Sequence, residues 1–111
     1  MKIAIVGYGK MGHIIENSAK NFGHEVVDTV DIIAKDATNL VPQGDYDAVA
    51  KAVKESGAEG VIEFSHPSSV MGNVNALIPL GIPVVIGTTG WNDKHAEVNE
   101  LASKCNGVAM T

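Results

Sequence analysis

The sequence predicts an α/β protein, built as a doubly wound parallel sheet in a single domain, and three observations lead to this prediction. Short apolar runs alternate with amphipathic stretches along the whole chain. The runs are apolar at almost every position, which is typical of strands buried on both faces of a parallel sheet. The chain has 111 residues, which is enough for one domain of ordinary size and too few for two.

The first three elements are predicted as strand, helix and strand. An apolar run over residues 2–6 predicts a strand that ends at Gly7. A helix is predicted over residues 11–22, because apolar residues stand there at helical spacing, and Gly23 ends it. The apolar residues of this helix are Met11, Ile14, Ile15, Ala19 and Phe22. Residues 25–30 are rich in β-branched side chains and predict the second strand.

The middle of the chain begins with its least regular part, residues 31–44, where Pro42 and Gly44 predict a loop. Asp45 is a suitable N-cap for a helix that ends at Gly57. The apolar stripe of that helix is Tyr46, Val49, Ala50 and Val53. A third strand over residues 60–64 is followed by a helix predicted to run from Pro67 to about Leu77.

The last elements are a fourth strand over residues 83–86, a helix over residues 92–104 and the start of a strand at residues 108–111. Pro79 and Gly81 separate the fourth strand from the preceding helix. Asn92 or Asp93 caps the last helix, and Gly107 ends it. The alternation is therefore regular from one end of the chain to the other.

Composition excludes several function classes. The chain has 8 Lys and Arg against 13 Asp and Glu, a formal net charge of −5, whereas nucleic-acid-binding proteins usually have a basic face. No stretch approaches the roughly 18 apolar residues that cross a membrane. One cysteine, Cys105, fits a reducing compartment. The histidines are scattered, without metal-ligand spacing. We therefore expect a cytoplasmic protein without nucleic-acid or membrane partners and without a metal site.

Residues 7–12, Gly-Tyr-Gly-Lys-Met-Gly, match the G-x-G-x-x-G pattern directly between the first strand and the first helix. Gly7 permits the tight turn, Gly9 lets the backbone approach phosphate groups, and Gly12 lets the helix pack close to the strand. The N-terminus of the helix offers N–H groups and a partial positive charge to an anion. The pattern predicts a Rossmann-like dinucleotide-binding domain over residues 1–111.

An acidic residue at the end of the second strand is expected to bind the adenosine ribose hydroxyls. Asp31 lies about 20 residues beyond the glycine loop, as this role requires. Asp28 is the alternative, and strand alternation and the loop boundary favour Asp31. Ile32 and Ile33 follow where an arginine would favour a 2′-phosphate, although Lys10 and Lys35 are close enough in sequence to bind one. We predict that NADH is favoured as cofactor over NADPH.

Two further loops join the glycine loop at the carboxyl edge of the predicted sheet. They contain Glu-Phe-Ser-His-Pro at residues 63–67, with Asn73 beyond, and Val-Ile-Gly-Thr-Thr-Gly at residues 85–90. With these motifs the sequence resembles the N-terminal domain of 4-hydroxy-tetrahydrodipicolinate reductases (dihydrodipicolinate reductases), over essentially the whole chain. Members of that family reduce a cyclic imine-type precursor in lysine and diaminopimelate biosynthesis with NADH or NADPH, and work as homotetramers.

The resemblance implies a role for each motif. Residues Gly7, Tyr8, Gly9, Lys10, Met11 and Gly12 would form the pyrophosphate loop, and Asp31 would contact the ribose. The cofactor groove would also be lined by Phe64, Ser65, Gly87, Thr88 and Thr89, with Thr89 reaching the substrate. The chain departs from the family in three ways: its glycine loop is one residue shorter than is frequent there, Glu63 replaces the usual Asp, and no arginine follows Asp31.

The resemblance also implies that no catalytic residue lies in this chain. In the family a second domain supplies a His-His segment, a nearby lysine and a Lys-x-x-x-Ser-Gly-Thr-type segment, and the four histidines here are far apart. We expect a cofactor-binding half that ends before the catalytic domain, and that binds cofactor without turnover. The alternatives are another NAD(P)-dependent oxidoreductase domain and a stand-alone NAD-binding regulatory module.

Three other residues carry separate expectations. His66 lies in a predicted crevice loop, where a surface or hydrogen-bonding role is expected. Trp91 follows the Thr-Thr-Gly segment, and it would either flank the nicotinamide or the second domain, or pack on its own loop. Cys105 is expected to be structural or incidental, because Lys104 is its one basic neighbour in the sequence.

Overall fold

The computed structural model of the chain describes residues 1–42, 44–66, 68–87, 100 and 108–110. They form a parallel sheet with strand order β3-β2-β1-β4-β5-β6. The strands are β1 (Lys2–Val6), β2 (Glu25–Asp31), β3 (Asn39–Leu40), β4 (Gly60–Glu63), β5 (Pro83–Ile86) and β6 (Val108–Met110). The helices are α1 (Lys10–Asn21), α2 (Tyr46–Ser56), α3 (Val70–Leu77) and a short 3₁₀ turn, Ile78–Leu80. This order is that of a doubly wound Rossmann-type sheet, so the predicted fold class is confirmed.

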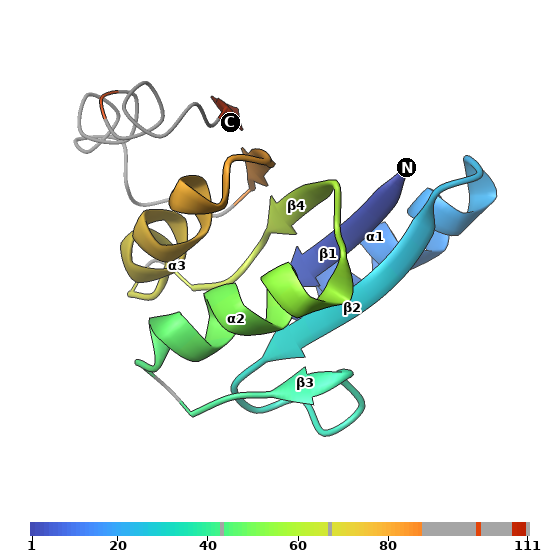
Figure 1. Cartoon of the computed structure of the whole chain (residues 1–111). Coiled ribbons are helices and arrows are strands. Elements are labelled where there is room, and N and C mark those ends of the chain that lie inside the picture. The colour runs from blue at the N-terminus through green and yellow to red at the C-terminus, as the bar shows by residue number, and fades with distance from the viewer. Residues whose placement is uncertain (43, 67, 88–99, 101–107, 111) are drawn as a thin grey trace.

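The sheet is covered on both faces. Figure 1 shows α2 and α3 in front of the sheet and α1 behind it. Successive residues of β1 divide between the two faces: Ala4 and Val6 belong to the core under α2 and α3, whereas Ile3 and Ile5 pack with Ala19 of α1. The larger core lies under α2 and α3, with Val53, Val74, Leu77 and their neighbours fully buried. Burial on both faces explains why the strands are apolar at nearly every position.

The predicted N-cap of α2 and the glycines that end α1 and α2 agree with the structure. Asp45 caps α2 with its side chain, which accepts a hydrogen bond of 3.1 Å from the N–H of Ala48. Gly57 ends α2 with a φ of 76°, and Gly23 follows α1 with a φ of 82°, a backbone region that glycine adopts without a steric penalty. The predicted helix over residues 92–104 lies outside the described residues. No helix among the described residues is long and apolar enough to cross a membrane.

Two predicted boundaries were wrong. The loop predicted over residues 31–44 contains the two-residue strand β3, which polar side chains hold against β2: Asn39 Nδ2 donates to Asp28 at 2.7 Å, and Thr38 N donates to Thr29 Oγ1 at 2.8 Å. The third helix begins at Val70 and not near residue 67, because Ser69 N and Val70 N both donate to the carbonyl of His66 in a preceding turn.

The apolar stripe expected on the first helix is only partly buried. Ile15 and Ala19 pack on the sheet, but Met11 is 44% exposed, Ile14 47% and Phe22 81%. The helix packs on β1 and β2. Among the described residues, these strands cover only part of the apolar face of α1.

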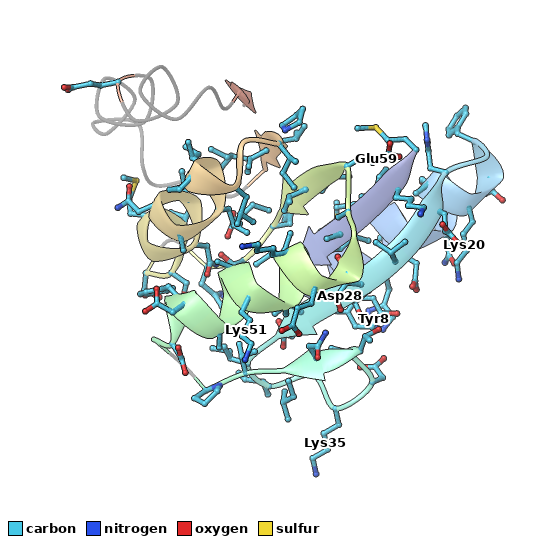
Figure 2. The ribbon with its side chains drawn as sticks, in the orientation of Figure 1. Tyr8, Lys20, Asp28, Lys35, Lys51 and Glu59 are labelled. Atoms are coloured by element: carbon cyan, nitrogen blue, oxygen red, sulfur yellow. The ribbon has the colours of Figure 1, made fainter. Side chains whose placement is uncertain are left out.

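Asp28 of β2 is a buried carboxylate whose hydrogen bonds are only partly satisfied. It is 2% exposed, and it lies close to residues of β3 and α2 (Figure 2). Its Oδ1 accepts the hydrogen bond from Asn39, while its Oδ2 has no hydrogen-bond partner among the described residues. Burial raises the pKa of Asp28, since a charged carboxylate is poorly solvated there.

We predict that Asp28→Asn stabilises the protein at pH 7, by about 1 kcal/mol, because it removes a buried charge with an unsatisfied oxygen. The pKa of Asp28 is higher in the folded state than the unfolded value of about 3.9, so the wild type loses stability as pH rises from the unfolded pKa to the folded pKa. The advantage of the variant should therefore appear above pH 4 and vanish below it. Urea unfolding from pH 3 to pH 7 measures this, with the exposed Asp47→Asn as control; a variant no more stable than wild type at pH 7 contradicts the prediction.

Candidate functional site

A groove lies at the carboxyl edge of the sheet, where the chain goes from β1 to its neighbour β2 on one side and later to β4 on the other. Ligands of doubly wound sheets bind at such a switch point. The groove has a volume of about 470 Å³. It is lined by eight of the predicted site residues: Gly7, Gly9, Lys10, Met11, Gly12, Asp31, Phe64 and Ser65. Ile33, Ala34 and His66 complete the lining.

The other predicted residues are placed differently. Tyr8 is 7% exposed and is not part of the groove lining. Its hydroxyl donates to Glu16 at 2.6 Å, and its N–H donates to Asp31 at 3.0 Å. Gly87 packs on the ring of Phe64, which a Cβ at position 87 would approach to 2.3 Å. Thr88, Thr89, Trp91 and Cys105 lie outside the described residues.

Gly7 and Gly12 are required by the fold itself. Gly7 has a φ of 97°, and a Cβ there would lie 2.2 Å from the carbonyl oxygen of Phe64. A Cβ on Gly12 would lie 2.5 Å from the carbonyl oxygen of Gly7. Both distances are far below a van der Waals contact, so these glycines allow the loop after β1 to pass close to the loop after β4 and α1 to start directly above β1.

Gly9 differs from its two neighbours in the motif. Its φ is −86°, which any residue adopts, and a Cβ built there would meet no atom within 4 Å. Nothing in the described chain therefore requires a glycine at this position. Gly9 lines the groove, and the space that its missing side chain leaves is where a ligand could approach the backbone.

The N-terminus of α1 opens into the same groove. No side chain caps it, and its first turn contains no acidic residue. The first N–H groups of a helix have no partner within the helix. Lys10 and Met11 also line the groove, so N–H groups, a helix dipole and an ammonium group converge on one place. Such a place binds an anion, of which a phosphate group is the commonest example.

Asp31 connects the glycine loop to the loop after β2. Its Oδ1 accepts from the N–H of Tyr8 at 3.0 Å, and its Oδ2 accepts from Ile33 at 3.0 Å and Ala34 at 2.7 Å. Partial burial alone would raise the pKa of Asp31, but these three donors and the nearby His66 outweigh it, and the pKa lies below its ordinary value. Asp31 is thus an ionised carboxylate in the groove, whereas Asp28, its alternative, is buried away from it.

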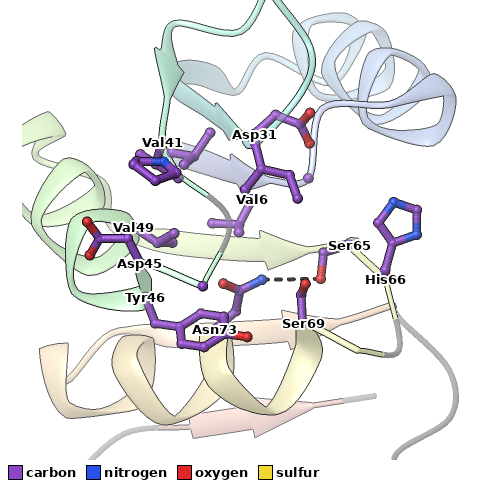
Figure 3. A pocket seen from close by; sticks show the side chains of 15 residues that line it. Val6, Asp31, Val41, Asp45, Tyr46, Val49, Ser65, His66, Ser69 and Asn73 are labelled. Atoms are coloured by element: carbon purple, nitrogen blue, oxygen red, sulfur yellow. Dashed lines mark hydrogen bonds between the residues drawn. The ribbon is translucent and has the colours of Figure 1, made fainter.

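Three motif residues, Glu63, Ser65 and Asn73, form a buried polar cluster behind the groove, and the sequence did not predict this contact. Glu63, fully buried at the end of β4, accepts hydrogen bonds from Ser65 Oγ and, at 3.0 Å, from Asn73 Nδ2. Figure 3 shows Asn73 of α3 hydrogen bonded to Ser65 beside a smaller cavity of about 30 Å³. The cluster fixes the loop of residues 64–66, which borders both the groove and this cavity.

His13 is a second feature that the sequence did not indicate. The structure places its exposed ring between Gly9 and Asp36. The spacing between His13 and Asp36 matches no known motif, so the sequence alone does not predict their contact, which depends on the conformation of the loop after β2. Among the described residues, no group of three or more His, Cys, Asp or Glu side chains could hold a metal ion.

Comparison with known proteins places the chain in a family. The family model "Dihydrodipicolinate reductase, N-terminus" matches residues 1–111. The chain belongs to this family. It is 34% identical to a 4-hydroxy-tetrahydrodipicolinate reductase of Christiangramia forsetii over 94% of the chain and 38% of that protein. It is also 34% identical to the reductase of Staphylococcus haemolyticus, over 92% of the chain and 40% of that protein.

The chain thus spans about two-fifths of the length of the family members it matches. Among solved structures, it superposes on a hyperthermophilic archaeal homoserine dehydrogenase in complex with NADPH, with a TM-score of 0.63 and 17% identity. That match covers 98% of the chain and 43% of the dehydrogenase. This similarity shows a shared Rossmann-type fold.

We predict that Gly7→Ala destabilises the chain by about 3 kcal/mol or more, because it adds a steric conflict with the Phe64 backbone to an unfavourable φ. The control is Gly23→Ala, where φ is 82° but a Cβ meets no atom within 4 Å; it should cost only about 1 kcal/mol, from the left-handed backbone alone. Urea unfolding of both variants measures the difference. Equal losses would mean that the two loops are not in close contact.

Proposed function

We propose that this chain binds a nicotinamide dinucleotide, with the pyrophosphate at the N-terminus of α1 and the adenosine ribose at Asp31. The observation that carries the proposal is Gly9: the fold does not require a glycine there, and the position lies beside the uncapped N-terminus of α1. A bound pyrophosphate accounts for both facts, since its oxygens would occupy the space next to Gly9 and accept from the first N–H groups of the helix.

The site residues fit this ligand. Residues 10–12 would donate backbone N–H groups to the phosphates, and Lys10 would add a positive charge. Asp31 would accept from ribose hydroxyls on its remaining lone pair or by exchanging one backbone donor. Phe64 and Ser65 would border the groove beyond the pyrophosphate. Family membership supports the proposal that Gly87, Thr88 and Thr89 lie beside the nicotinamide and that Thr89 also reaches the substrate.

In the full-length protein we assign the activity of a 4-hydroxy-tetrahydrodipicolinate reductase, in lysine and diaminopimelate biosynthesis. The bound cofactor would supply a hydride to a cyclic imine-type substrate. The residues of this chain would bind and orient the dinucleotide, and a second domain would donate the proton and hold the anionic groups of the substrate. A cytoplasmic homotetramer is part of this proposal. The chain alone should bind cofactor without turnover.

NADH is the favoured cofactor in this proposal. A 2′-phosphate on the adenosine ribose would lie beside the ionised Asp31. Ile32 and Ile33 stand where an arginine would neutralise the phosphate. Lys10 and Lys35 oppose this repulsion, so NADPH binding should be weaker rather than absent.

Calorimetric titration of the chain with NADH and NADPH tests the cofactor proposal. We expect saturable binding of both, with NADH tighter. A preference of tenfold or more for NADPH would contradict the assignment of Asp31. In a coupled assay of NADH oxidation with the imine substrate, the chain should show no sustained turnover; sustained turnover would place catalytic groups within these residues.

Gly9→Ala tests the observation on which the proposal rests. We expect at least a tenfold weaker affinity for NADH, because the added methyl group occupies the space assigned to the pyrophosphate. Folding stability should stay within about 1 kcal/mol of wild type, since the methyl group meets nothing in the protein. Asn17→Ala, at an exposed position of α1 outside the groove, is the control for affinity. Unchanged NADH affinity in Gly9→Ala would rule out a pyrophosphate at this position.

A further inference from the structure

His13 of α1 is hydrogen bonded on both sides of its ring. Nδ1 lies 2.7 Å from the carbonyl oxygen of Gly9, and Nε2 lies 2.6 Å from Oδ2 of Asp36. A carbonyl oxygen and a carboxylate oxygen accept hydrogen bonds and do not donate them. Both ring nitrogens must therefore carry a proton, so this arrangement requires the imidazolium form of His13.

The imidazolium ring joins three segments that border the groove. It stacks on Tyr8 of the glycine loop, with ring centroids 3.9 Å apart and an interplanar angle of 24°. It bonds Gly9 in the same loop from its own position on α1. Through Asp36 it reaches the loop after β2, residues 32–38, which we call the adenosine loop because it begins next to Asp31 and contributes Ile33 and Ala34 to the groove.

The adenosine loop is held at its start, at its middle and at its end, where the N–H of Thr38 donates to Thr29 Oγ1 at 2.8 Å. Asp31 fixes its start by accepting from the N–H groups of Ile33 and Ala34. His13 fixes its middle through Asp36, which is otherwise exposed. The first point is a permanent contact, since the pKa of Asp31 is lowered. The second depends on the charge of a histidine, which titrates near neutral pH.

The charged and titratable groups around His13 stabilise its protonated form. Asp36 faces His13 from the adenosine loop, and Tyr8 faces it from the glycine loop. Glu16 faces it from α1, and Lys20 Nζ lies 4.0 Å from the Glu16 carboxylate. The hydrogen bond to Gly9, then that to Asp36, raise the pKa of His13 above its ordinary value. The hydrogen bond to His13 in turn lowers the pKa of Asp36. The positive end of α1 opposes protonation, and these acceptors outweigh it.

We propose that His13 is a positioning residue, which in its imidazolium form fastens the adenosine loop to the glycine loop and holds the adenosine end of the groove in the shape that binds the dinucleotide. This inference rests on the proposed function and adds pH regulation to the same site. A raised folded-state pKa means that the contact is fully present below the ordinary histidine value of about 6.5 and is lost as pH rises through the folded-state value.

The consequence for binding concerns the adenosine half of the ligand. When His13 loses its proton, its ring can donate to only one of Gly9 and Asp36, and the ion pair with Asp36 is lost. The loop that carries Ile33 and Ala34 is then held firmly at its two ends, by Asp31 and Thr29, and less firmly at its middle. Affinity for NADH and for ADP-ribose should then fall about two- to fivefold, the range typical of an exposed charged contact. Nicotinamide mononucleotide does not reach the adenosine loop, so its affinity should not change with the state of His13.

The experiment titrates NADH, ADP-ribose and nicotinamide mononucleotide into wild type, His13→Gln and Asp36→Asn at pH 6 to pH 9, with His24→Gln and Asp47→Asn as matched controls. Wild type and both controls should lose adenosine-dependent affinity as pH rises. His13→Gln and Asp36→Asn should bind at all pH values as wild type does at pH 9. His66 also lines the groove, so loss of the pH dependence in His13→Gln assigns it to His13.

A second measurement follows His13 directly. In NMR spectra its ring resonances, assigned by their absence in His13→Gln, should titrate with a pKa above 6.5, and this pKa should fall in Asp36→Asn. The inference is overturned if His13→Gln keeps the wild-type pH dependence of NADH affinity, or if the pKa of His13 does not respond to Asp36→Asn. If wild type binds NADH with an affinity independent of pH, this inference alone fails; if it binds no dinucleotide at any pH, the proposed function fails too.

Discussion

The close passage of Gly7 beneath the backbone of Phe64 is the contact on which the rest of the site depends. A Cβ at position 7 would lie 2.2 Å from the Phe64 carbonyl oxygen, so glycine alone lets the loops after β1 and β4 meet. The sheet hydrogen bonds continue through this point, from Gly7 N to Val30 O at 2.7 Å and from Phe64 N to Val6 O at 2.8 Å. The glycine loop, Asp31 and the residues 64–66 are thereby brought around one groove.

Carboxylates then hold this arrangement in place from three directions. Asp31 joins the glycine loop to the adenosine loop, and Glu63 anchors Ser65 and Asn73 behind the loop of residues 64–66. Asp36 pairs with His13 at the outer edge. Each accepts a hydrogen bond from another element: Asp31 from the glycine loop, Glu63 from α3 and Asp36 from α1. Such cross-links make a site formed by loops rigid enough to bind a ligand in one orientation. The N-terminus of α1, in contrast, has no acidic residue in its first turn and so remains available to an anion.

The sequence predicted the fold and the centre of the site because both depend on strong local signals. Apolar runs located the strands of the sheet, and the glycine spacing with Asp31 located most of the groove. The strand β3 was missed because Asn39 and the preceding Thr38 are held by the side chains of Asp28 and Thr29 and not by an apolar pattern. The His13–Asp36 pair joins positions far apart in the chain, and the exposure of Phe22 depends on which part of α1 the sheet covers. No periodicity or spacing records such tertiary contacts.

The most direct test of the account follows the backbone amide resonances of the chain during titration with NADH. A pyrophosphate at the N-terminus of α1 should shift the resonances of residues 9–12 most, followed by residues 31–34 and 64–66, in a saturable manner. Shifts confined to a separate apolar groove, lined by Ile3, Ile14, Phe22 and Ile62, or the absence of any shift at residues 9–12, would contradict it.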